Sequence, residues 1–137
     1  MGAGWVVADC FDSFAQLASH HSEGTDFRIT CRDAANLKVC IVAPHAGKIE
    51  KGTSEIACAI ASEDFGLYLF EGTMPNKNAR LHITSHKFDE PQGIKLVSRH
   101  EVVIGIHGRK DHATVGGVDS DDPKTTFLGG LNSHVIN

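Results

Sequence analysis

Two short runs of apolar, largely β-branched residues constrain the fold of this 137-residue chain most strongly. One is VCIVA at residues 39–43, and the other is VVIGI at residues 102–106. Runs of this kind are typical of strands that are buried on both faces of a parallel sheet. We expect the first strand to span 38–43 and to stop at Pro44, because proline lacks the backbone N–H that a strand ladder needs.

The rest of the chain alternates between helical and extended patterns. Helices are predicted at residues 11–20, from Thr53 or Ser54 onward, and at 91–97, and further strands at 27–31, 66–70 and 81–84. In the second helix, Ile56, Ala57 and Ile60 are expected to form the inward stripe. This alternation predicts an α/β fold with a mostly parallel, mixed and twisted sheet that is flanked by helices.

The length and composition predict one compact domain. Apolar residues make up 41% of the chain and charged residues 22%, a mixture that can build a core and does not favour disorder. We expect residues 1–10 to be an N-terminal extension and residues 11–137 to form a single α/β domain.

Charge and hydropathy exclude some classes of function. The formal net charge of −4 argues against a nucleic-acid-binding surface, which needs many basic residues. No apolar run is long enough for a signal peptide or a membrane span. We therefore expect a soluble monomer that makes no membrane contact, either cytoplasmic or released by lysis.

The four cysteines do not suggest a metal or redox motif. No two of them form a C-x-x-C pair, which argues against a zinc knuckle and against a thioredoxin-like site. Cys40 and Cys58 lie among apolar residues and are expected to be small, buried hydrophobic side chains.

Histidine, by contrast, is abundant, with nine residues, and two predicted strands run directly into a histidine segment. The first strand leads into His45 and Glu50, and the second leads into His107. If the two strands are parallel neighbours, these three side chains converge at one edge of the sheet, where α/β folds place their sites. Two imidazoles and one carboxylate are a known catalytic zinc set that leaves a fourth position open. The alternative is that such histidines are ordinary loop residues that bond to backbone carbonyls.

Several segments together resemble the poly-γ-glutamate hydrolase family, which is found in phages and bacilli and is related in fold to zinc carboxypeptidases. The segment that carries most of the resemblance is APHAGKIEKGTSE at residues 43–55. Others follow in the family's order: DFRI (26–29), FGLYLFEG (65–72), LHITSHKFDEP (81–91), VVIGIHG (102–108) and VGG-D (115–119). The resemblance covers most of the chain from about Phe11 onward.

The resemblance implies a function and a set of site residues. It implies one zinc ion per chain, held by His45, Glu50 and His107. It also implies hydrolysis of γ-glutamyl amide bonds in poly-γ-glutamate through a metal-activated water. A polyanionic substrate needs positive charge at the mouth of the site, for which we name Arg109 and Lys48. His82 is either a further substrate contact or a hydrogen-bonded group that lies in the core or supports a ligand from behind.

One part of the family's pattern is missing from the sequence. The resemblance implies a general-base carboxylate near the C-terminus, in a strand of the form G-V-Q-L-E-L, and this chain has no such segment. The domain is therefore expected to be incomplete at its C-terminal end, and Glu71 is the local carboxylate that we name for the base. A second hypothesis is a zinc-containing module that binds acidic polymer with little or no catalysis. A third, a flavodoxin-like or dinucleotide-binding protein, lacks a G-x-G-x-x-G motif after a strand.

Overall fold

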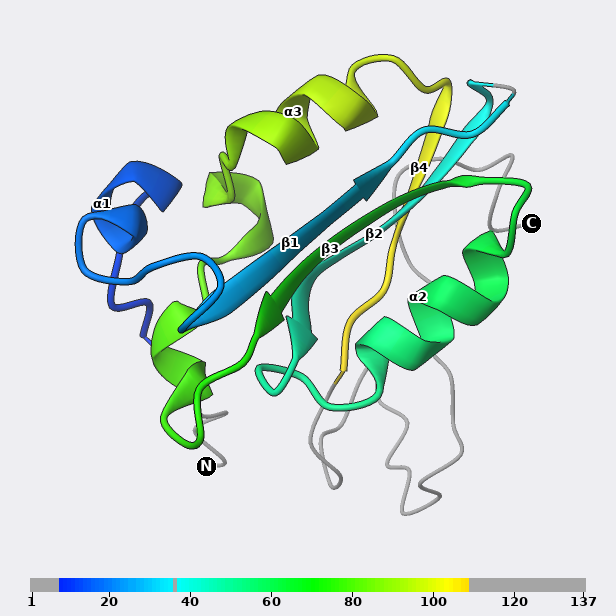
Figure 1. Ribbon diagram of the computed structural model, residues 1–137. Helices are drawn as coiled ribbons and strands as arrows, with labels where there is room; N and C mark the ends of the chain where they lie inside the picture. The colour runs from blue at the N-terminus through cyan, green and yellow to red at the C-terminus, as the bar shows by residue number, and fades with distance from the viewer. Residues whose placement is uncertain (1–7, 36, 109–137) are drawn as a thin grey trace, which may run out of the picture. The chain divides into compact units, whose positions relative to one another are not determined.

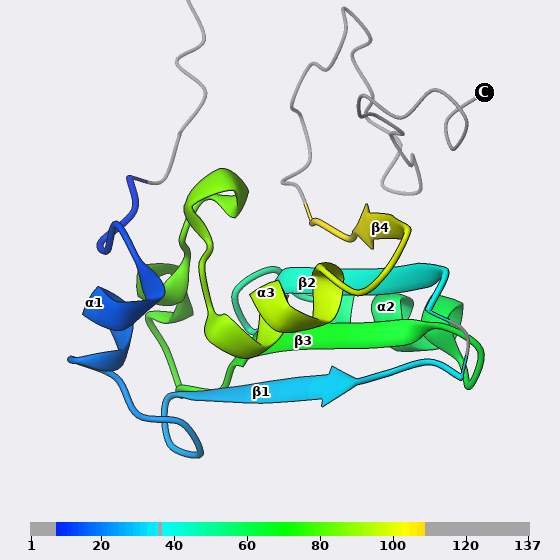
Figure 2. The same ribbon diagram turned by 90° about the horizontal axis from the view of Figure 1, so that it is seen from above.

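The computed structural model describes residues 8–35 and 37–108, which contain a four-stranded sheet with helices on both faces (Figure 1). Its strands are β1 (Phe27–Arg32), β2 (Val39–Gly47), β3 (Gly66–Gly72) and β4 (Val102–Gly105). Figure 2 shows their order, β1-β3-β2-β4. β2 runs parallel to both β3 and β4, whereas β1 pairs with β3 in the antiparallel direction. The predicted α/β class with a mostly parallel, mixed sheet is confirmed.

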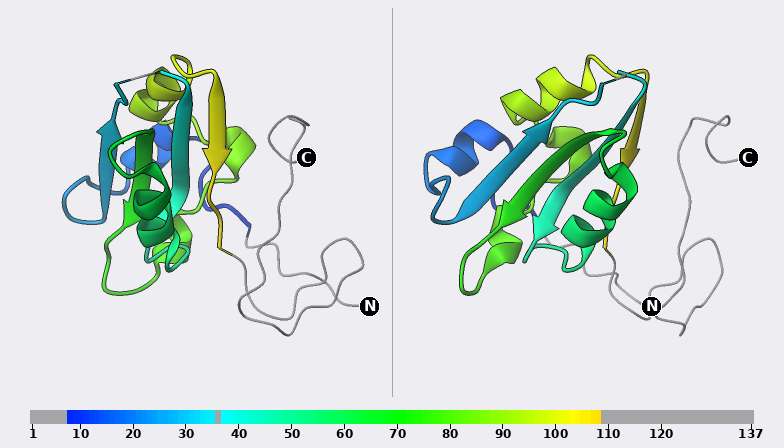
Figure 3. Two further views of the ribbon diagram at one scale, coloured as in Figure 1. Left: turned by 90° about the vertical axis from the view of Figure 1, so that its right-hand side faces the viewer. Right: turned by 45° about the vertical axis from the view of Figure 1, so that its right-hand side comes forward.

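The helices divide between the two faces of the sheet (Figure 3). They are α1 (Phe14–Ala18), α2 (Thr53–Ala61), α3 (Pro91–Val97) and two short 3-10 helices, η1 (Asn78–Leu81) and η2 (Ser85–Lys87). On one face, Leu17 of α1 and Leu96 of α3 pack against Phe70 of β3 and its neighbours. On the other face, Ala57 and Ala61 of α2 pack against apolar side chains of β2 and β3. Within the described residues, no helix combines the length and the apolar character that crossing a bilayer requires.

Strand β2 is longer than predicted, because it continues through Pro44 to Gly47. A register shift accommodates the proline: Ala43 lies opposite Leu69 and Ala46 opposite Glu71, so that two residues of β2, Pro44 and His45, face one residue of β3. This is the two-against-one pattern of a β-bulge, which leaves one residue outside the ladder. The prediction that the strand stops at Pro44 was therefore wrong.

Helix α2 corrects two further predictions. Its N-cap is Gly52, with a φ of 92°, and not Thr53 or Ser54. Both hydroxyls are engaged elsewhere, since Thr53 donates to the carbonyl of Glu50 and Ser54 to Glu71.

The inward face of α2 agrees with the prediction at Ala57 but not at Ile56 and Ile60. Ala57 and Ala61 are fully buried, as expected of side chains four residues apart on one face, while Ile56 and Ile60 are 52% and 44% exposed. The two alanines pack against the sheet, whereas the two isoleucines do not. Cys58 is exposed as well, contrary to expectation, whereas Cys40 is buried as predicted.

Residues 81–84 do not form the predicted strand. Leu81 and Ile83 are fully buried and His82 between them is not, so the alternation in the sequence is real. Among the described residues, however, none of the four strands pairs with this segment, which connects η1 and η2 and contributes to the core on the α3 face. The predicted helix at 11–20 is also shorter, and α1 is capped by Ser13.

Glu90 ties the start of α3 to the sheet. Its carboxylate accepts hydrogen bonds from the backbone N–H groups of Gln92 and Gly93 and from the hydroxyl of Tyr68, and the residue is 2% exposed. Burial and the neighbouring Glu90 carboxylate raise the pKa of Tyr68 well above its usual range, so the hydroxyl stays protonated as the donor.

Replacing Glu90 by alanine is expected to lower the free energy of unfolding by about 2 to 4 kcal/mol. The change removes the N-cap of α3 and leaves a buried tyrosine hydroxyl without its acceptor. Urea denaturation followed by circular dichroism measures the effect. Glu63→Ala, at an exposed position, is the matched control and should stay within about 0.5 kcal/mol of the parent protein. Equal losses for the two variants would contradict the assignment.

Candidate metal centre

The site lies where β2 and β4 end, because these two strands are parallel neighbours. Val42 of β2 pairs with Gly105 of β4, so the residues that follow each strand emerge at the same edge of the sheet. His45 follows within β2, and His107 lies two residues beyond the end of β4. The bulge in β2 directs His45 to the α3 face, where its ring lies edge-on to Phe88.

Glu50 reaches the same place from the turn between β2 and α2. The turn is held by the N–H of Glu50, which donates to the carbonyl of His45 at 2.8 Å, and by the hydroxyl of Thr53, which donates to the carbonyl of Glu50 at 2.7 Å. Gly47, with a φ of 66°, starts this turn, and a β-carbon there would lie 2.7 Å from the carbonyl oxygen of Gly72. The position therefore requires glycine.

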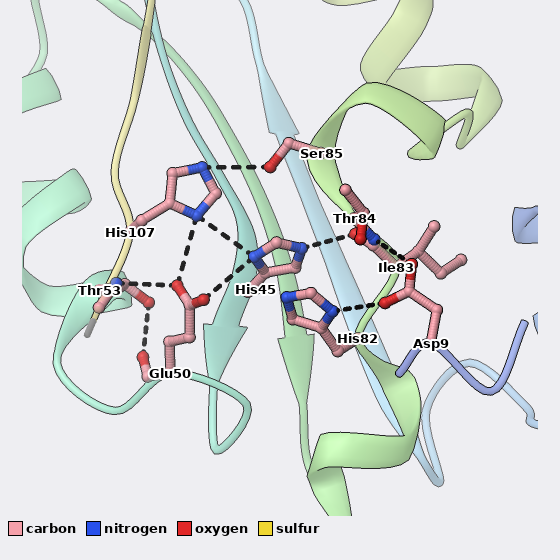
Figure 4. Close-up of polar contacts among 10 residues, drawn as sticks. Asp9, His45, Glu50, Thr53, His82, Ile83, Thr84, Ser85 and His107 are labelled. Carbon is pink, nitrogen blue, oxygen red and sulfur yellow. Dashed lines mark hydrogen bonds and ion pairs between the residues drawn. The ribbon is translucent and has the colours of Figure 1, made fainter. Parts of the chain in front are cut away.

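The structure brings the three predicted side chains into direct contact (Figure 4). Nδ1 of His45 lies 3.2 Å from Nδ1 of His107 and 3.2 Å from Oε1 of Glu50, and Nδ1 of His107 lies 3.5 Å from Oε2 of Glu50. The exposed fractions of the side chains of His45, Glu50 and His107 are 3%, 18% and 42%. The cluster is thus buried on the sheet side and open to solvent beside His107.

The tautomer of His45 is defined by its second ring nitrogen. Nε2 lies 2.7 Å from the carbonyl oxygen of Ile83 and must carry a proton to donate to it. In the neutral ring this leaves a lone pair on Nδ1, directed at Glu50 and His107. A backbone carbonyl behind a ligating imidazole is the usual arrangement in metal sites, where it fixes the ring and raises its basicity.

Glu50 remains ionised to low pH. Burial alone would raise its pKa, but the contacts with the rings of His107 and His45 and the hydrogen bond from the N–H of Gly108 outweigh burial and lower the pKa from 4.5 to about 2. The carboxylate is therefore negatively charged across the whole range of pH in which a protein is normally studied.

This donor set fits a zinc ion. A carboxylate and two imidazole nitrogens face one another at 3.2 to 3.5 Å, an arrangement of acceptors that needs a shared proton or cation between them. In a tetrahedral zinc site with bonds of 2.0 to 2.1 Å, neighbouring ligand atoms are about 3.3 to 3.4 Å apart. Two histidines and one acid also match the ligand types of catalytic zinc sites.

His82 is an alternative to His107 as the third ligand. Its ring stacks on that of His45 with centroids 3.9 Å apart, and ligand atoms of His45, Glu50 and His82 all lie within 4.8 Å of one another. His107 is closer to both partners, at 3.2 and 3.5 Å. The distances therefore favour His107 as the third ligand, with His82 behind the cluster.

The other predicted site residues lie apart from this cluster or outside the described part of the chain. The ammonium group of exposed Lys48 donates to the carbonyls of Thr73 and Met74. Arg109 and the VGG-D segment lie outside the described residues.

Glu71 lies on β3 opposite Ala46, whose side chain belongs to the α2 face of the sheet. Its carboxylate accepts hydrogen bonds from Arg28 at 2.7 and 2.9 Å and from Ser54 at 2.8 Å. These contacts link three elements on the face opposite His45, and they favour a structural role. A role for Glu71 as the general base stays a prediction from the sequence.

An apolar cavity of about 350 Å³ adjoins the cluster. It lies between the sheet and α3, and its lining includes Val42, Pro44, Tyr68, Phe88, Ser85 and His107. Ser85 Oγ lies 3.3 Å from Nε2 of His107, so the cavity meets the cluster at this ring.

The comparison with known families agrees with this geometry. The sequence profile of poly-gamma-glutamate hydrolase matches residues 11–136. The chain belongs to the poly-gamma-glutamate hydrolase family. It is 41% identical over 119 residues to the SPbeta prophage-derived UPF0714 protein YoqZ of Bacillus subtilis (strain 168), and 39% identical over 114 residues to the UPF0714 protein YmaC of the same organism. These alignments cover 85% and 81% of this chain, and 42% and 48% of the relatives.

Solved structures show the same family fold. A bacteriophage poly-gamma-glutamate hydrolase matches 77% of this chain with a TM-score of 0.73 and 34% sequence identity. YndL, solved in a zinc-free apo form, matches 77% of this chain with a TM-score of 0.71 and 36% identity. The matches cover 51% and 50% of those chains, so this chain spans about half the length of its relatives.

Sequence reasoning missed the groups that hold the cluster from behind. Asp9 bonds to His82, and the Ile83 carbonyl bonds to His45, although both are far from His45 in the chain. A backbone carbonyl leaves no trace in a sequence, and a single aspartate before the family's first residue has no motif around it. Only the alternation of buried residues at Leu81 and Ile83 indicated that His82 lies at the boundary of the core.

Proposed function

We propose that this protein is a zinc-dependent hydrolase that cleaves γ-glutamyl amide bonds of poly-γ-glutamate, with His45, Glu50 and His107 as its zinc ligands. The observation that carries the proposal is the convergence of these three side chains at distances of 3.2 to 3.5 Å. His107 is 62 positions from His45 and 57 from Glu50 in the chain. Membership in a hydrolase family supports the reaction class.

The residues of the chain have distinct tasks in this proposal. His45 is fixed by the Ile83 carbonyl and presents Nδ1 to the ion, and Glu50 supplies the negative charge from its turn. His107 is the most exposed of the three and borders the solvent. When bound, zinc supplies Lewis acidity for the amide carbonyl and lowers the pKa of water.

The substrate fits the surroundings of the cluster in two respects. The γ-linked chain contains methylene groups, which can bind in the apolar cavity beside His107. Its free α-carboxylates need cationic partners, for which Arg109 and Lys48 remain our proposals. Arg109 follows Gly108, whose N–H donates to Glu50, and so it adjoins the cluster in sequence.

One observation favours a second candidate function. The carboxylate of Glu71 is occupied by Arg28 and Ser54 on the opposite face of the sheet, so it is poorly placed to accept a proton at the cluster. Without a general base, a zinc site can bind substrate, but its turnover is about 10²-fold or more slower than with the base. The second candidate is therefore a zinc-containing module that binds acidic polymer without cleaving it.

Metal analysis and a depolymerisation assay together test both functions. We expect the purified chain to hold about one zinc per molecule and to shorten poly-γ-glutamate on a sizing gel. α-Linked polyglutamate has the same charge and serves as the linkage control, which should stay intact. Zinc with bound but uncut γ-polymer would favour the second function, and a chain that takes up no zinc would refute both.

A further inference from the structure

Asp9 precedes the residues that match the family, which begin at residue 11, yet it bonds to His82, whose ring stacks on His45 of the metal cluster. One carboxylate oxygen lies 2.8 Å from Nδ1 of His82, and the other accepts the backbone N–H of Thr84 at 2.8 Å (Figure 4). The side chain is only 9% exposed. Although burial alone would raise the pKa of Asp9, hydrogen bonds from Thr84 and His82 lower it below its usual value, so the group acts as an ionised double acceptor.

The two bonds of Asp9 enclose the residue that sets the tautomer of His45. Ile83 lies between His82 and Thr84, and its carbonyl accepts the Nε2–H of His45 at 2.7 Å. The Ile83 side chain is fully buried in the core on the α3 face of the sheet. The direction of the Ile83 carbonyl therefore depends on the buried Ile83 side chain and on the two hydrogen bonds of Asp9, to His82 and to Thr84.

His82 adds a second path from Asp9 to the cluster. Its ring stacks on that of His45 at 3.9 Å with an angle of 27° between the planes. Because Asp9 accepts the proton of Nδ1, the plane of the His82 ring is fixed, and the ring of His45 contacts His82 and the ring of His107.

We propose that Asp9 is a positioning residue for the metal centre: by clamping His82 and Thr84 it holds the Ile83 carbonyl against Nε2 of His45 and so keeps Nδ1 free to bind the ion. The part of this inference that concerns metal affinity rests on the proposed function, whereas the tautomer of His45 can be measured without any metal.

Asp9→Asn is the discriminating variant because it keeps the size of the side chain. An amide has one acceptor oxygen, so if that oxygen keeps the N–H of Thr84, the NH₂ group faces Nδ1 of His82, which can keep the contact only by giving up its proton. Asp12→Asn is the matched control. It removes an aspartate three positions away that is 77% exposed and pairs with Lys87 on the surface.

The experiment uses the full chain with ¹⁵N-labelled histidine. In the metal-free protein, long-range ¹H–¹⁵N spectra report the tautomer of His45, and competition with a chromophoric chelator gives the zinc affinity. We expect the parent protein and Asp12→Asn to show the Nε2–H form of His45. Asp9→Asn should show a mixture of tautomers and bind zinc about 10- to 100-fold more weakly, as outer-shell changes generally do.

The outcomes separate this inference from the proposed function. A parent protein that binds no zinc would refute the function, while the tautomer spectra would still decide the role of Asp9. An unchanged His45 tautomer in a folded Asp9→Asn variant, with zinc affinity within about twofold of the parent, would refute the positioning role.

A second variant covers the case in which Asp9→Asn does not fold. His82→Phe keeps an aromatic ring to stack on His45 and removes one of the two bonds of Asp9. We expect a partial shift of the His45 tautomer in the metal-free chain, with a melting temperature close to that of the parent. A wild-type His45 spectrum in this variant would contradict the path through His82.

Discussion

Replacing His107 by alanine is expected to abolish stoichiometric zinc binding and to lower the zinc affinity by more than about 100-fold. Loss of an outer-shell partner already costs about 10- to 100-fold, and His107 contributes a nitrogen 3.2 Å and 3.5 Å from the other two ligands. Two ligands remain in His107→Ala, which are too few for a stable site of this type. Chelator competition and elemental analysis measure the loss.

The same experiment decides between His107 and His82 as the third ligand. His82→Ala should cost no more than an outer-shell change, about 10- to 100-fold, because His82 acts from behind His45 in our interpretation. His86→Ala, at an exposed position in the same segment, is the control and should bind zinc as the parent does. A larger loss in His82→Ala than in His107→Ala would reverse the assignment.

Zinc affinity is expected to fall about 100-fold per pH unit in acid, below the range in which imidazoles generally titrate. Two histidines must each lose a proton to bind the ion, which gives a slope of two in a plot of the logarithm of the dissociation constant against pH. Glu50 adds no third proton, since its pKa is lowered to about 2. Chelator competition at a series of pH values measures the slope.

The slope also counts the histidines in the site. A slope near one would mean that a single imidazole binds the ion, and a slope near three would admit His82 as a further ligand.

In the metal-free chain, Glu50 contributes stability that is fully present above pH 4.5 and is lost as the pH falls toward 2, because the pKa of Glu50 is lower in the folded state than in the unfolded state. Glu50→Gln should remove this part of the acid dependence, which chemical denaturation at pH 3 and pH 6 can show.

The zinc site and the cavity beside it have different physical origins. The proposed ligands lie in or just beyond two parallel strands, so their convergence follows from the topology of the sheet. The cavity comes from the packing of α3 over the same strands and borders His107. Changes that move α3, such as Glu90→Ala, are therefore expected to alter polymer binding more than zinc binding.

The sequence alone determined the class of the fold and the meeting of the cluster. VCIVA and VVIGI are apolar at every position, a pattern that predicts parallel strands in an α/β fold. The prediction of burial on both faces is confirmed for β2, whereas β4 lies at the edge of the described sheet with Val103 44% exposed. From this pattern, His45, Glu50 and His107 could be placed at one sheet edge before any coordinates. The order of polar and apolar residues predicts the strands because each side chain has its own free energy of transfer from water to the core.

The tertiary structure alone decided how β2 passes Pro44, which face α2 buries and what holds His45 from behind. Periodicity favoured Ile56 and Ile60 together with Ala57, but the contact of α2 with the sheet buries Ala57 and Ala61 and leaves both isoleucines exposed. The bulge that turns His45 toward α3 depends on the register of β3, which is 20 or more residues distant. The bond of Asp9 to His82 and the bond of His45 to the Ile83 carbonyl each join segments more than 35 residues apart. A backbone carbonyl is present in every residue, so the sequence does not mark the one that His45 uses. Local patterns therefore predicted most of the strands and the convergence of His45, Glu50 and His107, whereas long-range packing set the orientation of each side chain.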